Sequence, residues 1–163
     1  MKANRGPVTP GASEAKPPAP AAARPNTAVL TLETVEGSGL RFRARAGSGT
    51  EMMLDSGPGM LAPSPVEALL VALAGCGGMD VISILRKKRQ VVLGYEVAVT
   101  GERRERHPRS FTRIEVVHRL RGRGLSPAAV EEAIRLSDTK YCSVHASLAR
   151  EIEIVSRFEI VPA

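Results

Sequence analysis

Aromatic residues are scarce in this chain of 163 residues, at 3%, and tryptophan is absent. The formal net charge of +6 is an excess of the kind found in nucleic-acid-binding proteins. Proteins that bind single strands stack the bases on aromatic side chains, however, and few are available here. About half of the positive excess also lies in the first 27 residues. We therefore expect no nucleic-acid partner.

Cysteine is nearly as scarce, and the two residues, Cys76 and Cys142, are far apart in the sequence. Their separation excludes a CxxC motif and the zinc patterns built from paired cysteines. P-loop, GxGxxG, GxSxG and HExxH motifs are also absent. A zinc site in which Cys76, Cys142, His145 and Asp80 converge is an alternative. Our expectation is that the protein binds neither a metal nor a cofactor.

Long apolar segments without charge are missing too. No uncharged apolar run reaches 18 residues, because Asp80 interrupts the single candidate. No secretory apolar segment opens the chain. We therefore expect a soluble, cytoplasmic protein without a membrane partner, whose thiols stay reduced unless they are redox-active.

The first 27 residues differ from the rest because they are rich in proline and alanine and show no apolar period. Such a segment cannot bury enough apolar surface to offset the entropy of ordering. We predict a disordered tail at residues 1–27 and one folded domain at residues 28–163, which is an ordinary domain size.

A long helix at residues 64–90 is the clearest predicted element. Ser64 is a suitable N-cap, the proline that follows suits the first helical position, and Glu67 completes a capping box. The basic run 86–89 lies at the negative end of the helix dipole. Residues 69–85 are almost entirely apolar, with Asp80 the only charge, so we expect this helix to be buried.

The remaining elements follow from apolar periodicity and turn residues. Strands are predicted at residues 28–36, 40–46, 51–55, 92–101, 111–121 and 151–161. Two shorter helices are predicted at residues 126–137 and 141–149. The order βββ-α-ββ-αα-β places strands and helices in blocks, which indicates an α+β fold with a mostly antiparallel sheet. In the second strand Arg41, Arg43 and Arg45 share one face, which either faces solvent or contacts a ligand or partner.

Three glycines surround Cys76 in the long helix, at positions 75, 77 and 78. Each glycine costs a helix about 1 kcal/mol relative to alanine. They either let another helix pack closely or bring a group up to the Cys76 thiol, and the two interpretations are compatible. Asp80 lies one turn further along the same face. A buried carboxylate there needs a partner, most plainly an arginine or hydrogen-bond donors. The alternative is a structural aspartate that caps or bonds a neighbouring element.

Cys142 lies near the start of a predicted short helix. If Thr139 is the N-cap, Cys142 is the third helical residue, beside free N–H groups and near Lys140, and both features favour a thiolate. His145 would lie on the same face. The alternative is a cysteine that is merely buried. The residues alone rank Cys142 above Cys76 as a thiolate, because Cys76 lies mid-helix in apolar surroundings.

Four segments carry a family resemblance: SPVEALLVALAGC at 64–76, DVISILRKKRQ at 80–90, GERRERHPRSFTRI at 101–114 and LSDTKYCSVHASL at 136–148. With the element order, they resemble the OsmC/Ohr family of hydroperoxide-resistance proteins, and its OsmC-like branch in particular. The resemblance covers residues 31–161.

The resemblance implies an intertwined homodimer in which antiparallel sheets pack around two central helices. It also implies that Cys76 is the peroxidatic thiol and Cys142 the resolving thiol. The expected activity is reduction of organic hydroperoxides, and more weakly of hydrogen peroxide, in defence against oxidative stress. The expected reductant is an external dithiol or a lipoylated protein.

Two departures from the family pattern leave an alternative open. Where family peroxidases carry a glutamate after the proline of the helix start, this chain has Val66, and Glu67 is one position out of register. Family peroxidases also carry a catalytic arginine in the turn of the first hairpin, and Arg41 matches its position only approximately. Asp80 and Arg41 are one hypothesis for a replacement pair. The alternative function is a non-catalytic OsmC-like protein that binds an apolar small molecule, or a redox sensor.

Overall fold

The computed structural model describes residues 26–33, 40–56 and 60–161. The predicted disordered tail therefore lies outside the described residues, except for its last two positions. Of these, Thr27 is ordered, because its carbonyl accepts a hydrogen bond of 2.8 Å from the backbone N–H of Gly47. The predicted turn at residues 36–39 also lies outside the described part of the chain.

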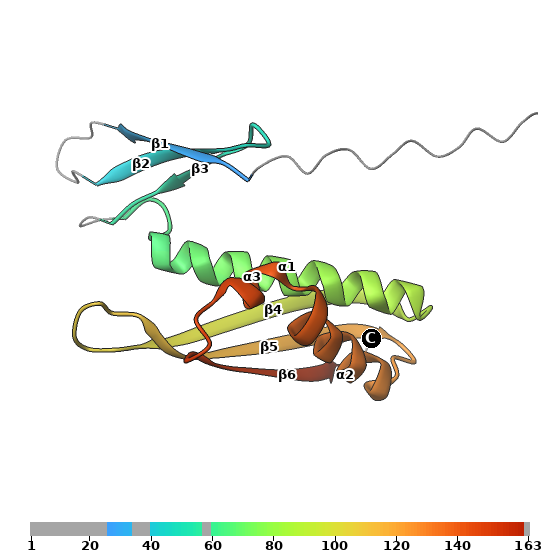
Figure 1. Ribbon diagram of the computed structural model, residues 1–163. Coiled ribbons are helices and arrows are strands. Elements are labelled where there is room, and N and C mark those ends of the chain that lie inside the picture. Colours follow the sequence, from blue (N-terminus) through green and yellow to red (C-terminus); the bar gives the residue numbers. More distant parts are fainter. Residues whose placement is uncertain (1–25, 34–39, 57–59, 162–163) are drawn as a thin grey trace, which may run out of the picture.

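The element order matches the predicted one and confirms the α+β class (Figure 1). The strands are β1 (Ala28–Glu33), β2 (Arg41–Ala46), β3 (Glu51–Leu54), β4 (Val91–Arg103), β5 (Phe111–Arg123) and β6 (Glu153–Val161). The helices are α1 (Pro65–Lys87), α2 (Pro127–Leu136) and α3 (Ser143–Ser147), and a π-helical turn at Ser137–Tyr141 separates the last two. α1 ends before the predicted residue 90, since Lys88 is its C-cap and Arg89 has a positive φ of 56°. α3 is shorter than predicted because Cys142 is its N-cap and Leu148 its C-cap.

The strands form two three-stranded sheets, in the orders β1-β2-β3 and β4-β5-β6. All neighbours are antiparallel except β5 and β6, which run parallel, with Ile114 opposite Ile154. The expectation of mostly antiparallel pairing is therefore confirmed, with this pair as the exception. Parallel neighbours need a long crossover, and α2 and α3 supply it. In Figure 1 the first sheet lies on one side of α1 and the second sheet on the other.

Two clusters of buried side chains hold α1 against the second sheet. The first contains Val81 and Leu85 of α1, Leu120 of β5, and Val130, Ala133 and Ile134 of α2. The second contains Leu73, Phe111, Ile114, Val116 and Cys142. Cys76 and Val66 of α1 pack against this second cluster as partly buried residues. One of the two predicted reactive thiols is therefore part of the core, and the other borders it.

The predicted capping box starts α1. The Ser64 hydroxyl accepts a hydrogen bond of 3.3 Å from the backbone N–H of Glu67. The Glu67 carboxylate in turn accepts one of 2.8 Å from the backbone N–H of Ser64. Each side chain thus satisfies an N–H that the helix leaves free. These bonds hold the pKa of Glu67 below its ordinary value, the backbone bond contributing most. Glu67 caps the helix, as its position predicts.

Only one face of α1 is buried in the single chain, so the expectation of a fully buried helix is not met. Val71 is 64% exposed and Met79 is 76% exposed. By length and composition α1 is also apolar enough to cross a membrane, so Asp80 alone does not exclude a span. Core helices pass the same test. In the single chain 17% of the apolar window of α1 is buried, and Val81 and Leu85 are fully buried among other protein side chains.

Candidate functional site

Cys76, Asp80 and Cys142 converge between α1 and the segment that follows α2. The two sulfur atoms and a carboxylate oxygen of Asp80 all lie within 4.8 Å of one another. Cys76 and Asp80 are one turn apart on α1, so the helix itself brings them together. Cys142 comes from a distant part of the sequence and is 4% exposed, whereas Cys76 is half-buried. The fold thus assembles a dithiol beside a carboxylate.

The π-helical turn positions Cys142. The backbone N–H of Cys142 donates a hydrogen bond of 2.9 Å to the Ser137 carbonyl. Its sulfur then accepts the backbone N–H of His145 at 3.3 Å, so that Cys142 is itself the N-cap of α3. The predicted N-cap, Thr139, instead bonds back to the Arg135 carbonyl at 2.7 Å. The predicted placement of Cys142 as the third residue of a helix is therefore wrong.

Burial raises the pKa of the Cys142 thiol from 9.0 to about 11, and a hydrogen bond to the sulfur of Cys76 adds to the increase. The His145 N–H acts in the opposite direction, but does not compensate. Desolvation disfavours the thiolate, and the bond to Cys76 stabilises the protonated form. Cys142 is therefore protonated at neutral pH. This contradicts the expectation that its position favours a thiolate.

Asp80 has a neutral partner. The Ser137 hydroxyl donates a hydrogen bond of 3.2 Å to the Asp80 carboxylate. This is the alternative that we considered, in which the carboxylate bonds a neighbouring element. Because Ser137 also accepts the N–H of Cys142, one residue orients two members of the site. Among the residues that the structure describes, Asp80 forms no ion pair.

Arg41 pairs with a different carboxylate. Its Nε atom lies 3.3 Å from Oδ2 of Asp55, a residue that is 1% exposed. Asp55 also accepts the backbone N–H of Ser56 at 2.8 Å, and its own N–H donates to Pro63 at 3.1 Å. The hypothetical Arg41–Asp80 pair is thus replaced by two separate contacts. Sequence reasoning treated Asp55 only as a strand end. Its position before a loop rich in glycine and proline is a signal of such a turn.

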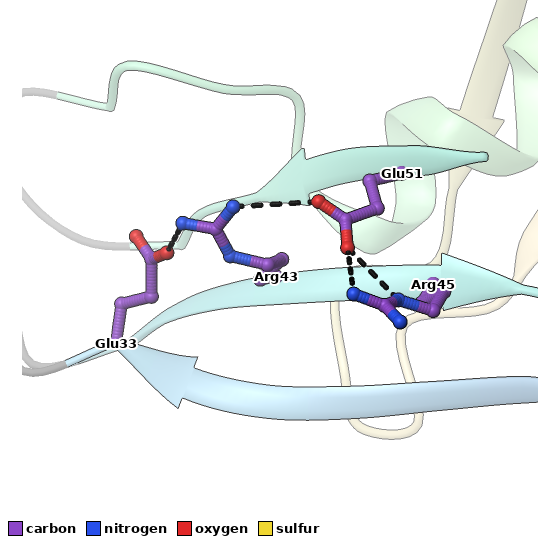
Figure 2. Close-up of polar contacts among 4 residues, drawn as sticks. All are labelled: Glu33, Arg43, Arg45 and Glu51. Atoms are coloured by element: carbon purple, nitrogen blue, oxygen red, sulfur yellow. Dashed lines mark hydrogen bonds and ion pairs between the residues drawn. The ribbon is translucent and has the colours of Figure 1, made fainter. Parts of the chain in front are cut away.

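The other arginines of β2 form exposed cross-strand ion pairs (Figure 2). Arg43 lies between Glu33 of β1 and Glu51 of β3, and bonds to both. Arg45 also bonds to Glu51, at 2.7 Å. Their side chains are 52% and 67% exposed. For Arg43 and Arg45 the structure favours the interpretation of a solvated face.

Lys140 and His145 contribute little to the geometry of the thiols. The Lys140 ammonium lies 5.4 Å from the centre of the Tyr141 ring. Nδ1 of His145 lies 3.6 Å from Asp138, and its ring is outside the group formed by the two sulfurs and Asp80. His145 reaches Cys142 through its backbone N–H only. The four-residue zinc set considered from the sequence is therefore reduced to three residues.

The glycines around Cys76 do not make room for Cys142. A methyl group at Gly77 would lie 3.7 Å from the Ser137 hydroxyl, which is an ordinary contact. At Gly78 it would meet Val97 of β4 at 3.4 Å. At Gly75 it would meet no described atom within 4 Å. Within one chain, only Gly78 borders on being required for close packing.

Beside Asp80 a cleft of about 430 Å³ opens to the surface. It is lined by Asp80, Ser83, Ile84, Lys87, Lys88, Leu136 and Tyr141. Apolar groups and lysine side chains share its walls, and Lys88 also pairs with Glu132 of α2. Asp80 belongs both to the cleft and to the group of donor atoms, whereas neither cysteine is among the residues that line the cleft.

The chain matches the model of the family described as OsmC-like protein over residues 57–157. It is 45% identical to protein YhfA of Escherichia coli K12 over 125 residues, which cover 77% of this chain and 93% of YhfA. A crystal structure of a hypothetical protein from Aquifex aeolicus is 31% identical, with a TM-score of 0.75, covering 86% of this chain and 98% of that one.

An OsmC-like protein from Mycoplasma pneumoniae shares the fold at 19% identity. Its TM-score is 0.72, and the match covers 85% of this chain and 98% of that one. The family model spans more than half of the sequence and contains both cysteines. The chain therefore belongs to the OsmC-like family.

Proposed function

We propose that this protein is a thiol-dependent peroxidase that reduces organic hydroperoxides, and more weakly hydrogen peroxide, in defence against oxidative stress. One observation carries the proposal: the sulfurs of Cys76 and Cys142 lie within 4.8 Å of each other, on separate elements. A disulfide requires an S–S distance of about 2.05 Å. Forming the disulfide would require side-chain rotations and a short movement of the π-helical turn.

The reaction has three balanced steps. The Cys76 thiolate attacks the terminal oxygen of the hydroperoxide and the O–O bond breaks, which leaves a Cys76 sulfenic acid. The alkoxide that departs takes a proton from water and becomes the alcohol. The Cys142 sulfur then bonds to the Cys76 sulfur, and the sulfenic hydroxyl leaves as water with the Cys142 proton. An external dithiol or lipoylated protein reduces the disulfide and is itself oxidised.

Burial supports this order of the two thiols. Cys142 is almost inaccessible and its pKa is raised to about 11, so it is poorly suited to meet the peroxide first. Cys76 is the more exposed thiol. The protonated Cys142 thiol, hydrogen-bonded to the Cys76 sulfur, is placed to respond once that sulfur is oxidised. The cleft beside Asp80 offers a route for the substrate.

The proposal includes a homodimer in the cytoplasm. Exposed apolar side chains of α1, Val71 and Met79 among them, form a surface that a second copy of the chain would cover. Val29, Leu30 and Leu32 of β1 are also more than half exposed. A reducing compartment would keep both thiols ready for peroxide.

The test is consumption of cumene hydroperoxide by the purified protein, with dithiothreitol or a lipoylated protein as reductant. We expect catalytic turnover by the native protein, its loss in Cys76→Ser, and a strong decrease in Cys142→Ser. A native protein that is fully reduced and dimeric, yet consumes no peroxide above the rate of dithiothreitol alone, would contradict the proposal.

A second candidate, a redox sensor or a small-molecule-binding protein without turnover, has its own support. Val66 stands where the family resemblance implies a glutamate, and it packs against the cluster that contains Cys142. Arg41 is bonded to Asp55 and forms no pair with Asp80 among the described residues, so the hypothetical Arg41–Asp80 pair is not there to activate a thiol. Formation of the disulfide without steady-state turnover would favour the sensor.

A further inference from the structure

We propose that the reduced thiols of Cys76 and Cys142, together with the Asp80 carboxylate, form a binding site for a zinc ion. The proposal does not depend on the peroxidase activity, because it concerns the reduced protein in the absence of peroxide. Two sulfur ligands and one oxygen ligand would hold the ion. The fourth position of a tetrahedral site would be left to water.

The distances between the donor atoms suit this coordination. All three lie within 4.8 Å of one another. Zinc binds sulfur at about 2.3 Å and carboxylate oxygen at about 2.0–2.2 Å, which puts neighbouring donors roughly 3.5–3.8 Å apart. The group has to contract by roughly an ångström at most. Cys76 and Asp80 are fixed on one helix, so the contraction needs mainly the Cys142 side chain to move.

The charges of the site also call for a cation. Two thiols and a carboxylate meet in a partly buried place, and ionising the thiols there would put three negative charges together. Among the described residues Asp80 forms no ion pair; Lys88 pairs with Glu132, Lys140 lies over Tyr141, and Lys87 lines the same cleft as Asp80. A divalent ion offsets this repulsion. Binding would replace the two thiol protons, so that two protons are released for each zinc ion bound.

Neighbouring groups orient the donors as the outer shell of a metal site does. The Ser137 hydroxyl donates to the Asp80 carboxylate at 3.2 Å. The His145 backbone N–H donates to the Cys142 sulfur at 3.3 Å. Such outer-shell bonds fix ligand direction and affect metal affinity. The cleft of about 430 Å³ that Asp80 lines gives the ion a path from solvent.

Zinc binding and disulfide formation would exclude each other, since both use the same two sulfur atoms. A zinc-bound pair would be protected from peroxide, and oxidation to the disulfide would release the ion. Availability of zinc would therefore decide how much of the protein is open to oxidation.

The experiment titrates zinc into reduced full-length protein in competition with a chromophoric chelator, and repeats the titration with Co²⁺. We expect one zinc ion per chain, two protons released, and a thiolate-to-cobalt charge-transfer band in the near ultraviolet. Cys76→Ser and Cys142→Ser should lose the band. Asp80→Asn should weaken binding, and Ser137→Ala should weaken it about tenfold to a hundredfold.

Asp138→Asn is the matched control, because Asp138 lies on the same π-helical turn but is not one of the three donors. The zinc affinity of this variant should equal that of the native protein. Circular dichroism confirms that each variant is folded. The disulfide form of the native protein should not bind. Absence of the cobalt band in reduced protein, or zinc affinity that persists after oxidation or in both folded serine variants, would overturn the proposal.

Discussion

Nε of Arg41 on β2 lies 3.3 Å from the Asp55 carboxylate, which follows β3 and is buried. The pair joins the first sheet to the loop that leads into α1. A buried carboxylate is costly unless it is paired or hydrogen-bonded. Arg41 is therefore assigned to holding this loop in place, rather than to activating a thiol.

Replacing Arg41 with methionine should destabilise the protein by about 1–3 kcal/mol, because the Asp55 carboxylate stays buried and loses its bond to the Arg41 guanidinium. Urea denaturation measures the change. Arg43→Met is the control: Arg43 is exposed and its surface ion pairs are worth less than about 1 kcal/mol. Arg41→Met should still form the Cys76–Cys142 disulfide. Loss of disulfide formation in a folded Arg41→Met protein would give Arg41 a role at the thiols.

Alkylation should distinguish the two thiols. At pH 7.5 iodoacetamide should label Cys76 well before Cys142, because Cys142 is buried and its pKa is raised to about 11. Labelling of Cys142 in the folded protein should increase with pH toward that value, as the thiolate fraction grows. Peptide mapping by mass spectrometry measures both rates. Equal rates, or faster labelling of Cys142, would contradict the order of the thiols.

Much of the fold follows from local signals in the sequence. The capping box at Ser64 and Glu67 predicts the start of α1, and alternation predicts the strands of both sheets. The direction of β6 was not predictable in this way, because alternation is the same in parallel and antiparallel strands. The crossover through α2 and α3 places β6 parallel to β5.

The sequence predicted which residues come together at the candidate site better than it predicted the protonation state of Cys142. The family resemblance identified Cys76 and Cys142, and helical spacing placed Asp80 beside Cys76. The state of Cys142 depends on its burial and on the π-helical turn, which has no pattern in the residues 137–141 that separates it from an ordinary helix start. Likewise, the partner of Arg41 is set by how the chain returns at Asp55, which is a tertiary contact.

Acid should destabilise the protein through His118. This residue is 2% exposed, its Nδ1 is 2.6 Å from the Tyr95 hydroxyl, and burial lowers its pKa below 6.5. The charge of Asp138 opposes the shift. The folded state holds His118 neutral. Its contribution to the free energy of unfolding is therefore complete above pH 6.5 and is lost as the pH falls through the pKa of His118 in the folded state. The free energy of unfolding should change through this one group by no more than about 1.4 kcal/mol per pH unit.

Urea denaturation between pH 7.5 and 5 measures this dependence. His118→Gln should flatten it, whereas His107→Gln, in the exposed loop between β4 and β5, should not. A native protein whose stability is constant across this range would show that His118 is not held neutral.

The exposed face of α1 predicts association. Sedimentation velocity at micromolar concentration should find a dimer, because Val71 and Met79 would otherwise leave a large apolar surface in water. Met79→Arg should weaken the dimer, and Glu105→Arg, in the exposed β4–β5 loop, should not. A native protein that sediments as a stable monomer would contradict this prediction.

The thiol pair is best tested with intact-protein mass spectrometry after adding one equivalent of cumene hydroperoxide to the reduced protein. The native chain should lose two hydrogens within minutes as the Cys76–Cys142 disulfide forms, and dithiothreitol should restore them. Cys142→Ser should stop at a Cys76 sulfenic acid or continue to sulfinic acid. Cys76→Ser should leave Cys142 unmodified at a comparable time.

These masses test whether Cys76 reacts first and Cys142 resolves it across the short distance between their sulfurs. We expect the disulfide in the native chain and a Cys76 oxide in Cys142→Ser. Rapid oxidation of Cys142 in Cys76→Ser would reverse the two roles. A native chain whose mass is unchanged by the peroxide would contradict the peroxidase itself.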